Sequence, residues 1–130
     1  MVGAVTVELT PTNVLAALEA VVAERGAGWV YPDEWRDDGV CRYVVDGCPA
    51  CIVGAALAHL GVPVDVLAAH EGLGVWALLD DLGRAGAVTV VGPVAAMLYD
   101  VQSVQDGDPP ERAPGTWGEA LAAARAAVPA

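Results

Sequence analysis

The brevity of its apolar segments constrains this chain more than any other feature. Apolar residues recur at helical spacing in several stretches, and Gly or Pro ends each stretch within a few turns. The 130 residues include 15 Gly and 9 Pro, residue types that interrupt helices and strands. With 55% hydrophobic residues the chain can still build a core. We therefore expect several short elements that close around one core, as a single globular domain over residues 1–130.

The segment that follows Thr10 is the most clearly marked helix. Thr10 suits the N-cap position, Pro11 suits the first helical position and Gly26 suits the C-terminal end. The apolar stripe between these signals has helical spacing and consists of Val14, Leu15, Leu18, Val21 and Val22.

Similar patterns predict the remaining helices. They are expected over residues 49–60, 65–70, 75–82, 93–104 and 116–128. The segment 49–60 is apolar on all sides, which indicates a helix surrounded by other elements. Thr116 and Glu119 have the spacing of a capping box at the start of the last helix. Because small residues dominate the chain, the four Trp are expected to supply much of the core volume, Trp76 among them.

Strand-forming residues are concentrated in a few short stretches. Residues 28–31 and 40–45 predict a two-stranded antiparallel ribbon with the polar loop 32–39 at its tip, and Asp46-Gly47 ends it. Residues 87–91 predict a further strand. The expected fold class is therefore α+β and mainly helical, with five or six short helices packed with a small antiparallel β-ribbon of two or three strands.

The charge balance limits the partners of the chain. Asp and Glu number 17 against 6 Lys and Arg, which gives a net charge of −11. This charge repels a nucleic-acid backbone and an anionic membrane surface, so neither is expected as a partner. The sequence has no apolar run long enough for a membrane span and no signal-like start. We expect a cytoplasmic protein.

Three cysteines offer the first candidate for chemistry. The pair in Cys48-Pro-Ala-Cys51 lies at a predicted helix start, where the helix dipole would favour a thiolate at Cys48. A zinc site is the related alternative, and its ligands would be Cys41, Cys48, Cys51 and His59. We favour a third interpretation, in which the cysteines are small packing residues in a reducing compartment. No metal or cofactor is then expected, and a zinc-stabilised or dithiol redox domain is the alternative.

An acidic loop with one aromatic residue offers the second candidate. It consists of Asp33, Glu34, Trp35, Arg36, Asp37 and Asp38. Its carboxylates would steer a basic protein surface towards it, with Trp35 as the anchor. The alternative is a solvated loop whose Trp35 folds back onto the ribbon.

The groups that enzymes need are sparse in this sequence. Ser103 is the only serine and has no nucleophile motif around it, and the chain contains no lysine for a phosphate-binding loop. The adjacent pairs Asp37-Asp38 and Asp80-Asp81 are expected on the surface rather than in a shared pocket. We therefore expect a protein without enzymatic activity.

Two blocks of the sequence resemble a known group of proteins. The stretch 41–57, together with 101–107 and 116–121, resembles uncharacterised small acidic proteins of actinobacteria and their phages. The resemblance implies a cytoplasmic accessory protein, such as a phage product that binds a host protein. Combined with the net charge and the acidic loop, it leads to the hypothesis of a non-enzymatic protein that binds another protein with a basic surface. A homodimer is expected if Trp35 or the Ala-rich last helix is exposed.

Overall fold

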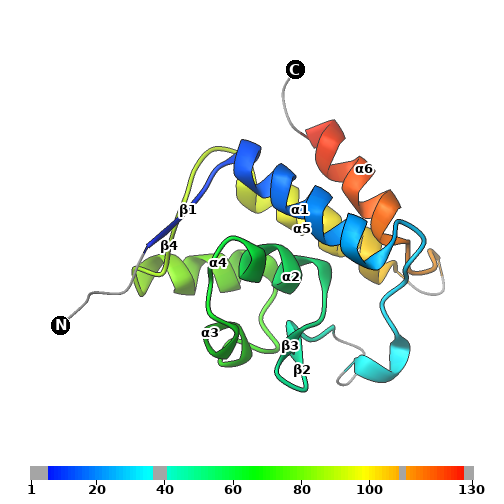
Figure 1. Ribbon diagram of the computed structural model, residues 1–130, viewed down its shortest axis with the longest axis horizontal. Helices are drawn as coiled ribbons and strands as arrows, with labels where there is room; N and C mark the ends of the chain where they lie inside the picture. The colour runs from blue at the N-terminus through cyan, green and yellow to red at the C-terminus, as the bar shows by residue number, and fades with distance from the viewer. Residues whose placement is uncertain (1–5, 37–40, 109–110, 128–130) are drawn as a thin grey trace.

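The first and the last helix of this protein begin at capping residues that the sequence shows. The computed structural model describes residues 6–36, 41–108 and 111–127. Within these ranges the helices are α1 (Pro11–Arg25), α2 (Ile52–His59), α3 (Val64–Ala68), α4 (Val75–Arg84), α5 (Val94–Asp106) and α6 (Trp117–Ala127), with the 3-10 turn η1 (Asp33–Trp35) (Figure 1). The strands are β1 (Val7–Leu9), β2 (Val44–Val45), β3 (Cys48–Pro49) and β4 (Val88–Val90). The mainly helical α+β fold class is confirmed. In the described ranges, every helix is too short or too polar to cross a membrane.

Local capping chemistry accounts for the start of the first and last helices. Thr10 Oγ1 accepts a hydrogen bond from Asn13 N at 3.1 Å, and Asn13 Oδ1 accepts one from Thr10 N at 2.9 Å. Before α6, Thr116 and Glu119 make the same reciprocal pair, at 2.9 and 3.1 Å. The backbone φ of 102° at Gly26, just after α1, favours glycine there. Both predicted helix starts are confirmed.

The antiparallel ribbon exists, but its predicted position is wrong. Strands β2 and β3 pair across the dipeptide Asp46-Gly47, whose φ angles are 51° and 76°. Positive φ at both positions is the requirement of a two-residue hairpin turn, so this dipeptide connects the two strands instead of ending the ribbon. Residues 28–31 form no strand, and residues 37–40 lie outside the described residues.

A second strand pair joins segments that are distant in the sequence. Strands β1 and β4 are parallel, with Val7 opposite Val88 and Leu9 opposite Val90. The predicted strand at 87–91 is thus confirmed, and its partner precedes α1. In Figure 1 this pair lies apart from the helices α1, α5 and α6, on the side of the molecule where α4 ends.

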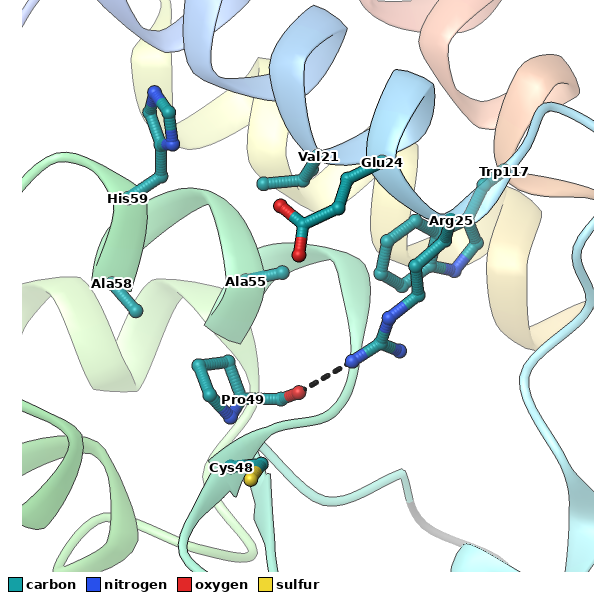
Figure 2. Close-up of a pocket in the computed structure, with 9 residues that line it drawn as sticks. All are labelled: Val21, Glu24, Arg25, Cys48, Pro49, Ala55, Ala58, His59 and Trp117. Atoms are coloured by element: carbon teal, nitrogen blue, oxygen red, sulfur yellow. Dashed lines mark hydrogen bonds between the residues drawn. The ribbon is translucent and has the colours of Figure 1, made fainter.

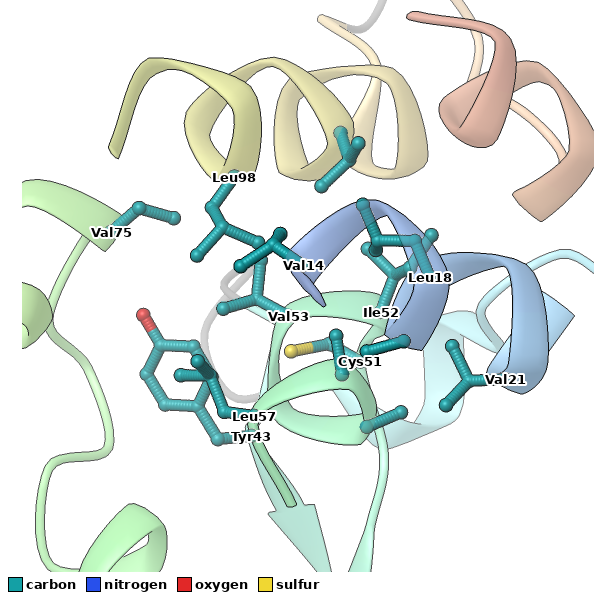
Figure 3. Packing of buried hydrophobic residues seen from close by; sticks show 14 of the residues in the cluster. Val14, Leu18, Val21, Tyr43, Cys51, Ile52, Val53, Leu57, Val75 and Leu98 are labelled. Carbon is teal, nitrogen blue, oxygen red and sulfur yellow. The ribbon is translucent and has the colours of Figure 1, made fainter. Parts of the chain in front are cut away.

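The core lies between α1, α2, α5 and α6. Figure 3 shows Leu18 of α1 beside Ile52 of α2, with Leu98 of α5 across from them. As expected for a central helix, the whole stretch 52–57 of α2 is buried. Gly54 allows this helix to approach the hairpin, because a Cβ built at Gly54 would lie only 2.5 Å from the Tyr43 carbonyl oxygen.

Candidate functional site

Three Trp side chains surround the guanidinium group of Arg25 at the end of α1. Its Cζ lies 4.5 Å from the ring centre of Trp29, 4.8 Å from that of Trp117 and 5.8 Å from that of Trp35. The same group donates hydrogen bonds to the carbonyl oxygens of Pro49 at 2.6 Å and of residue 50 at 2.8 Å. Arg25 therefore fastens α1 to the hairpin. Burial lowers the pKa of its guanidinium.

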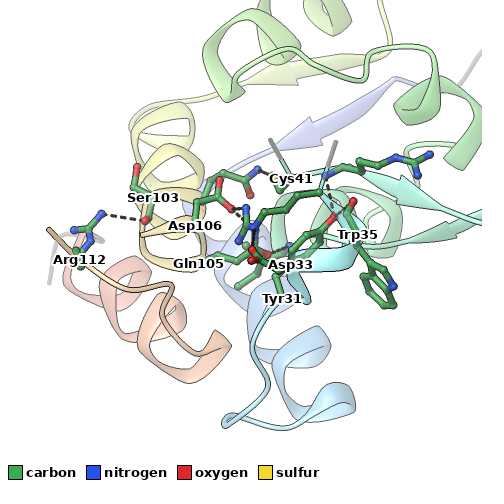
Figure 4. Close-up of polar contacts among 12 residues, drawn as sticks. Tyr31, Asp33, Trp35, Cys41, Ser103, Gln105, Asp106 and Arg112 are labelled. Atoms are coloured by element: carbon green, nitrogen blue, oxygen red, sulfur yellow. Dashed lines mark hydrogen bonds and ion pairs between the residues drawn. The ribbon is translucent and has the colours of Figure 1, made fainter. Parts of the chain in front are cut away.

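The predicted acidic loop is tied to the interior by two of its residues. Arg36 pairs with Asp106 at 2.8 Å and with Asp33 at 3.3 Å, and its side chain is only 9% exposed. The Trp35 carbonyl accepts a hydrogen bond from the Tyr31 hydroxyl at 3.1 Å, and the two rings pack edge to face (Figure 4). The structure thus folds Trp35 back onto the protein and leaves two exposed carboxylates, at Asp33 and residue 34. Asp37 and Asp38 lie outside the described residues.

The three cysteines are distributed over two environments. Cys41 and Cys51 are buried, whereas Cys48 is exposed in β3. The residue at the start of α2 is Cys51, whose Sγ accepts a hydrogen bond from Gly54 N at 3.4 Å, so the prediction that placed Cys48 at a helix start is wrong. A hydrogen bond to Cys51 and burial raise the pKa of the Cys41 thiol, so it stays protonated. Nowhere in residues 6–36, 41–108 and 111–127 do three His, Cys, Asp or Glu side chains form a group that could hold a metal ion.

A cavity of about 420 Å³ opens beside Cys48. Its lining consists of Val21, Glu24, Arg25, Cys48, Pro49, Ala55, Ala58, His59 and Trp117 (Figure 2). Figure 2 shows Cys48 of β3 and His59 of α2 at opposite ends of this lining. The Arg25 guanidinium is occupied by the backbone carbonyls.

A second exposed surface, which includes two aromatic residues, lies over α4, β4 and α5. Trp76 is 56% exposed and Tyr99 is 49% exposed, and their ring centres are 6.4 Å apart. Val90 and Val91 are exposed as well. We call these four residues the Trp76 surface. The prediction that Trp76 contributes to the core is wrong, because four aliphatic residues of α4 already fill its buried face: Val75, Leu78, Leu79 and Leu82.

A groove of about 610 Å³ runs along the Trp76 surface. It is lined by Trp76, Leu79, Asp80, Gly83, Arg84, Val88, Thr89, Val90 and Ala95. Sequence reasoning missed this site. The segment 75–82 contains more apolar residues than one face of a helix can bury, and this excess was the available signal for an exposed apolar site.

The lining of the groove holds one carboxylate and one cation. Asp80 and Arg84, the two charged residues of the lining, form an exposed ion pair at 3.1 Å, so their charges neutralise each other. Asp100 follows Tyr99 on the exposed side of α5, and Glu8 lies opposite Thr89 in the strand pair. The exposed carboxylates of Asp100 and Glu8 thus lie on α5 and β1, outside the lining itself.

Comparison of the chain with known protein families, with curated proteins and with solved structures finds no match.

Proposed function

We propose that this chain is a binding protein whose Trp76 surface receives a second protein. The observation that carries the proposal is the contiguous exposure of Trp76 and Tyr99, two large aromatic side chains from different helices with ring centres 6.4 Å apart. Aromatic residues are enriched among those that dominate binding energy in protein interfaces. An exposed apolar patch with a polar rim is typical of such an interface. Binding, and not catalysis, is the proposed activity.

The charge distribution supports a basic partner. Asp100 follows the patch residue Tyr99 and is exposed, and the whole chain carries −11. The negative electrostatic potential of such a chain accelerates its association with a positively charged surface. A second copy of the chain would bring like charges together at this surface. We therefore favour a different protein, such as a host protein acted on by an accessory factor in the cytoplasm, over a homodimer.

The acidic loop is a secondary part of this proposal. Trp35 and Arg36 are engaged within the chain, so they are less suited than Trp76 to contact a partner. Asp33 and Glu34 remain exposed and add to the field that attracts a basic surface.

The test is capture of a partner with surface variants of the full chain. The bait with both Trp76→Ala and Tyr99→Ala removes the aromatic side chains, and the matched control removes two exposed carboxylates by Asp33→Ala and Glu34→Ala. A partner captured from an actinobacterial lysate is then purified and its affinity measured against each form. Loss of two interface aromatics is expected to weaken binding at least about 30-fold, and the control only a few-fold. Equal affinity of the aromatic variant and the wild type would overturn the proposal.

A further inference from the structure

The cavity beside Cys48 has the size and the walls of a small-molecule site. Its volume of about 420 Å³ lies within the range of about 300–1,000 Å³ that is typical of ligand pockets. One wall belongs to α2, where Ala55 and Ala58 carry no atoms beyond Cβ and so leave room above the helix. Val21 of α1 and Pro49 of β3 add further apolar surface. The groove along α4 and β4 has no residue in common with this lining, so the cavity is a separate site.

Glu24 places a carboxylate over this apolar lining. It lies in the last turn of α1, and Figure 2 shows its carboxylate directed towards Ala55. The side chain is exposed, so a ligand can reach it. Among the described residues, Glu24 takes part in none of the ion pairs. An ionised carboxylate accepts hydrogen bonds and donates none, so the partner that suits it best is a positively charged donor.

The guanidinium group in the lining belongs to Arg25, and other parts of the chain hold it. It donates hydrogen bonds to the carbonyl oxygens of Pro49 at 2.6 Å and of residue 50 at 2.8 Å. Its Cζ lies 4.5 Å from the ring centre of Trp29 and 4.8 Å from that of Trp117, so indole rings cover it. Arg25 thus connects α1 to the hairpin and forms no ion pair with Glu24. Of these two charged side chains, Glu24 is the one left for a ligand.

We propose that this cavity binds a small organic amine, whose ammonium group pairs with Glu24 and whose apolar body packs on Ala55 and Ala58. This site is additional to the protein-binding surface proposed above and does not depend on it. Hydrogen bonds between ionised groups are about twice as strong as those between neutral groups, so an amine is favoured over an alcohol of the same shape. A carboxylate of that shape is repelled by Glu24. The apolar body gains affinity because its surface and that of the walls leave water.

Three probes of one shape test the class of ligand. They are cyclohexylmethylamine, cyclohexylmethanol and cyclohexanecarboxylate, each titrated into the full-length protein while the NMR shifts of its backbone amides are recorded. We expect the amine to bind about tenfold more tightly than the alcohol, with the largest shifts at residues of the lining, and the carboxylate to bind more weakly than both. An amine that binds no more tightly than the alcohol, that shifts residues elsewhere, or that does not bind at millimolar concentration overturns the proposal.

A charge-removing substitution tests the role of the carboxylate. Glu24→Gln keeps the shape of the side chain and removes its charge. Glu34→Gln is the matched control, because it removes one exposed negative charge from η1, outside the lining. We expect Glu24→Gln to lose about tenfold in affinity for the amine and to bind the alcohol like the wild type. The control should bind both probes like the wild type. An equal effect of the two substitutions on amine binding would overturn the pairing with Glu24.

A substitution that fills the cavity tests its location. Ala58 is only half-buried on α2, so Ala58→Leu extends into the cavity while the helix is preserved. Ala96→Leu is the matched control on the exposed face of α5. We expect Ala58→Leu to lose about tenfold or more in affinity for both the amine and the alcohol, and the control to retain it. Thermal unfolding monitored by circular dichroism verifies that both variants are folded. A folded Ala58→Leu variant that binds the amine like the wild type would overturn the proposed site.

Discussion

Gln105 is the residue whose replacement should test the packing of this fold most sharply. Its side chain on α5 is fully buried. Its Oε1 accepts hydrogen bonds from Ile52 N at 2.8 Å and from Trp117 Nε1 at 3.1 Å, and its Nε2 donates to Asp106 Oδ1 at 3.0 Å. One amide oxygen thus satisfies the first residue of α2 and the indole at the start of α6. The substitution Gln105→Met keeps the length of the side chain and removes this acceptor.

The expected loss of stability follows from the two donors left behind. A buried N–H without an acceptor costs about 1–3 kcal/mol, and Gln105→Met leaves two, at Ile52 and Trp117. The apolar Met side chain recovers part of this by hydrophobic burial, so the free energy of unfolding should fall by about 3 kcal/mol. With a urea m-value of about 2 kcal/mol per M, the unfolding midpoint should fall by about 1.5 M.

Urea unfolding followed by Trp fluorescence measures this effect. The matched control is Ala96→Met, which places the same side chain on the exposed face of the same helix and should change stability by less than about 0.5 kcal/mol. If Gln105→Met changed the free energy of unfolding no more than this control, the buried donors of Ile52 and Trp117 would not depend on Gln105. The reasoning about the α2–α5–α6 junction would then be refuted.

Three further predictions concern two glycines, the three cysteine thiols and two phenols. Gly54→Ala forces a Cβ to within 2.5 Å of a backbone oxygen and should destabilise the fold by about 2 kcal/mol or more. Gly83→Ala, whose Cβ has room, should raise stability by up to about 1 kcal/mol. Shifts of Tm in opposite directions for the two variants check this prediction. A thiol reagent should label Cys48 rapidly in the native protein and the two buried cysteines only after unfolding, and three fast thiols would contradict the burial. Burial raises the pKa of Tyr31 to about 12 and also raises that of Tyr43, so the stability contributed by their neutral phenols is complete below the unfolded pKa of about 10 and declines as the pH rises towards 12. A urea midpoint that stays constant between about pH 9 and pH 11 would contradict this last prediction.

Local chemistry is the part of this fold that the sequence could predict. The start of α1 at Thr10 and that of α6 at Thr116 depend on hydrogen bonds between residues three positions apart, which a linear pattern records directly. The end of α1 at Gly26 follows in the same way from a positive φ. These elements, and the α+β class that their number implies, did not need tertiary information.

Pairing between strands was predictable only where a turn determines it. Asp46-Gly47 is a strong two-residue hairpin signal, and reading it as the end of a ribbon displaced the whole prediction by one strand. The parallel pair is different in kind, because Val7 and Val88 meet only after the helices between them have packed. No local pattern encodes that partner choice.

Exposure of individual aromatic residues is also a tertiary property. The sequence left Trp35 open between a partner anchor and a residue folded back onto the ribbon, and it placed Trp76 in the core. In the structure Trp35 is folded back and Trp76 is exposed. The pairing of Arg36 with Asp106 on α5 helps to hold Trp35 against the protein. The aliphatic face of α4 leaves Trp76 outside. Both outcomes depend on contacts between distant segments.

The way this chain distributes its side chains favours binding as its activity. Small residues occupy much of the interior, with Ala17, Ala56 and Ala120 at 1% exposure or less, while Trp76 remains 56% exposed. Burial of a large apolar side chain contributes roughly 1.5–3 kcal/mol, so folding forgoes a substantial stabilisation at this position. A partner that covers Trp76 and the neighbouring Tyr99 would gain that contribution for the complex. The same argument does not extend to Trp29 and Trp117, because their rings already pack against Arg25 within the chain. Of the aromatic residues in the described ranges, Trp76 and Tyr99 are thus the two whose burial an intermolecular contact would complete.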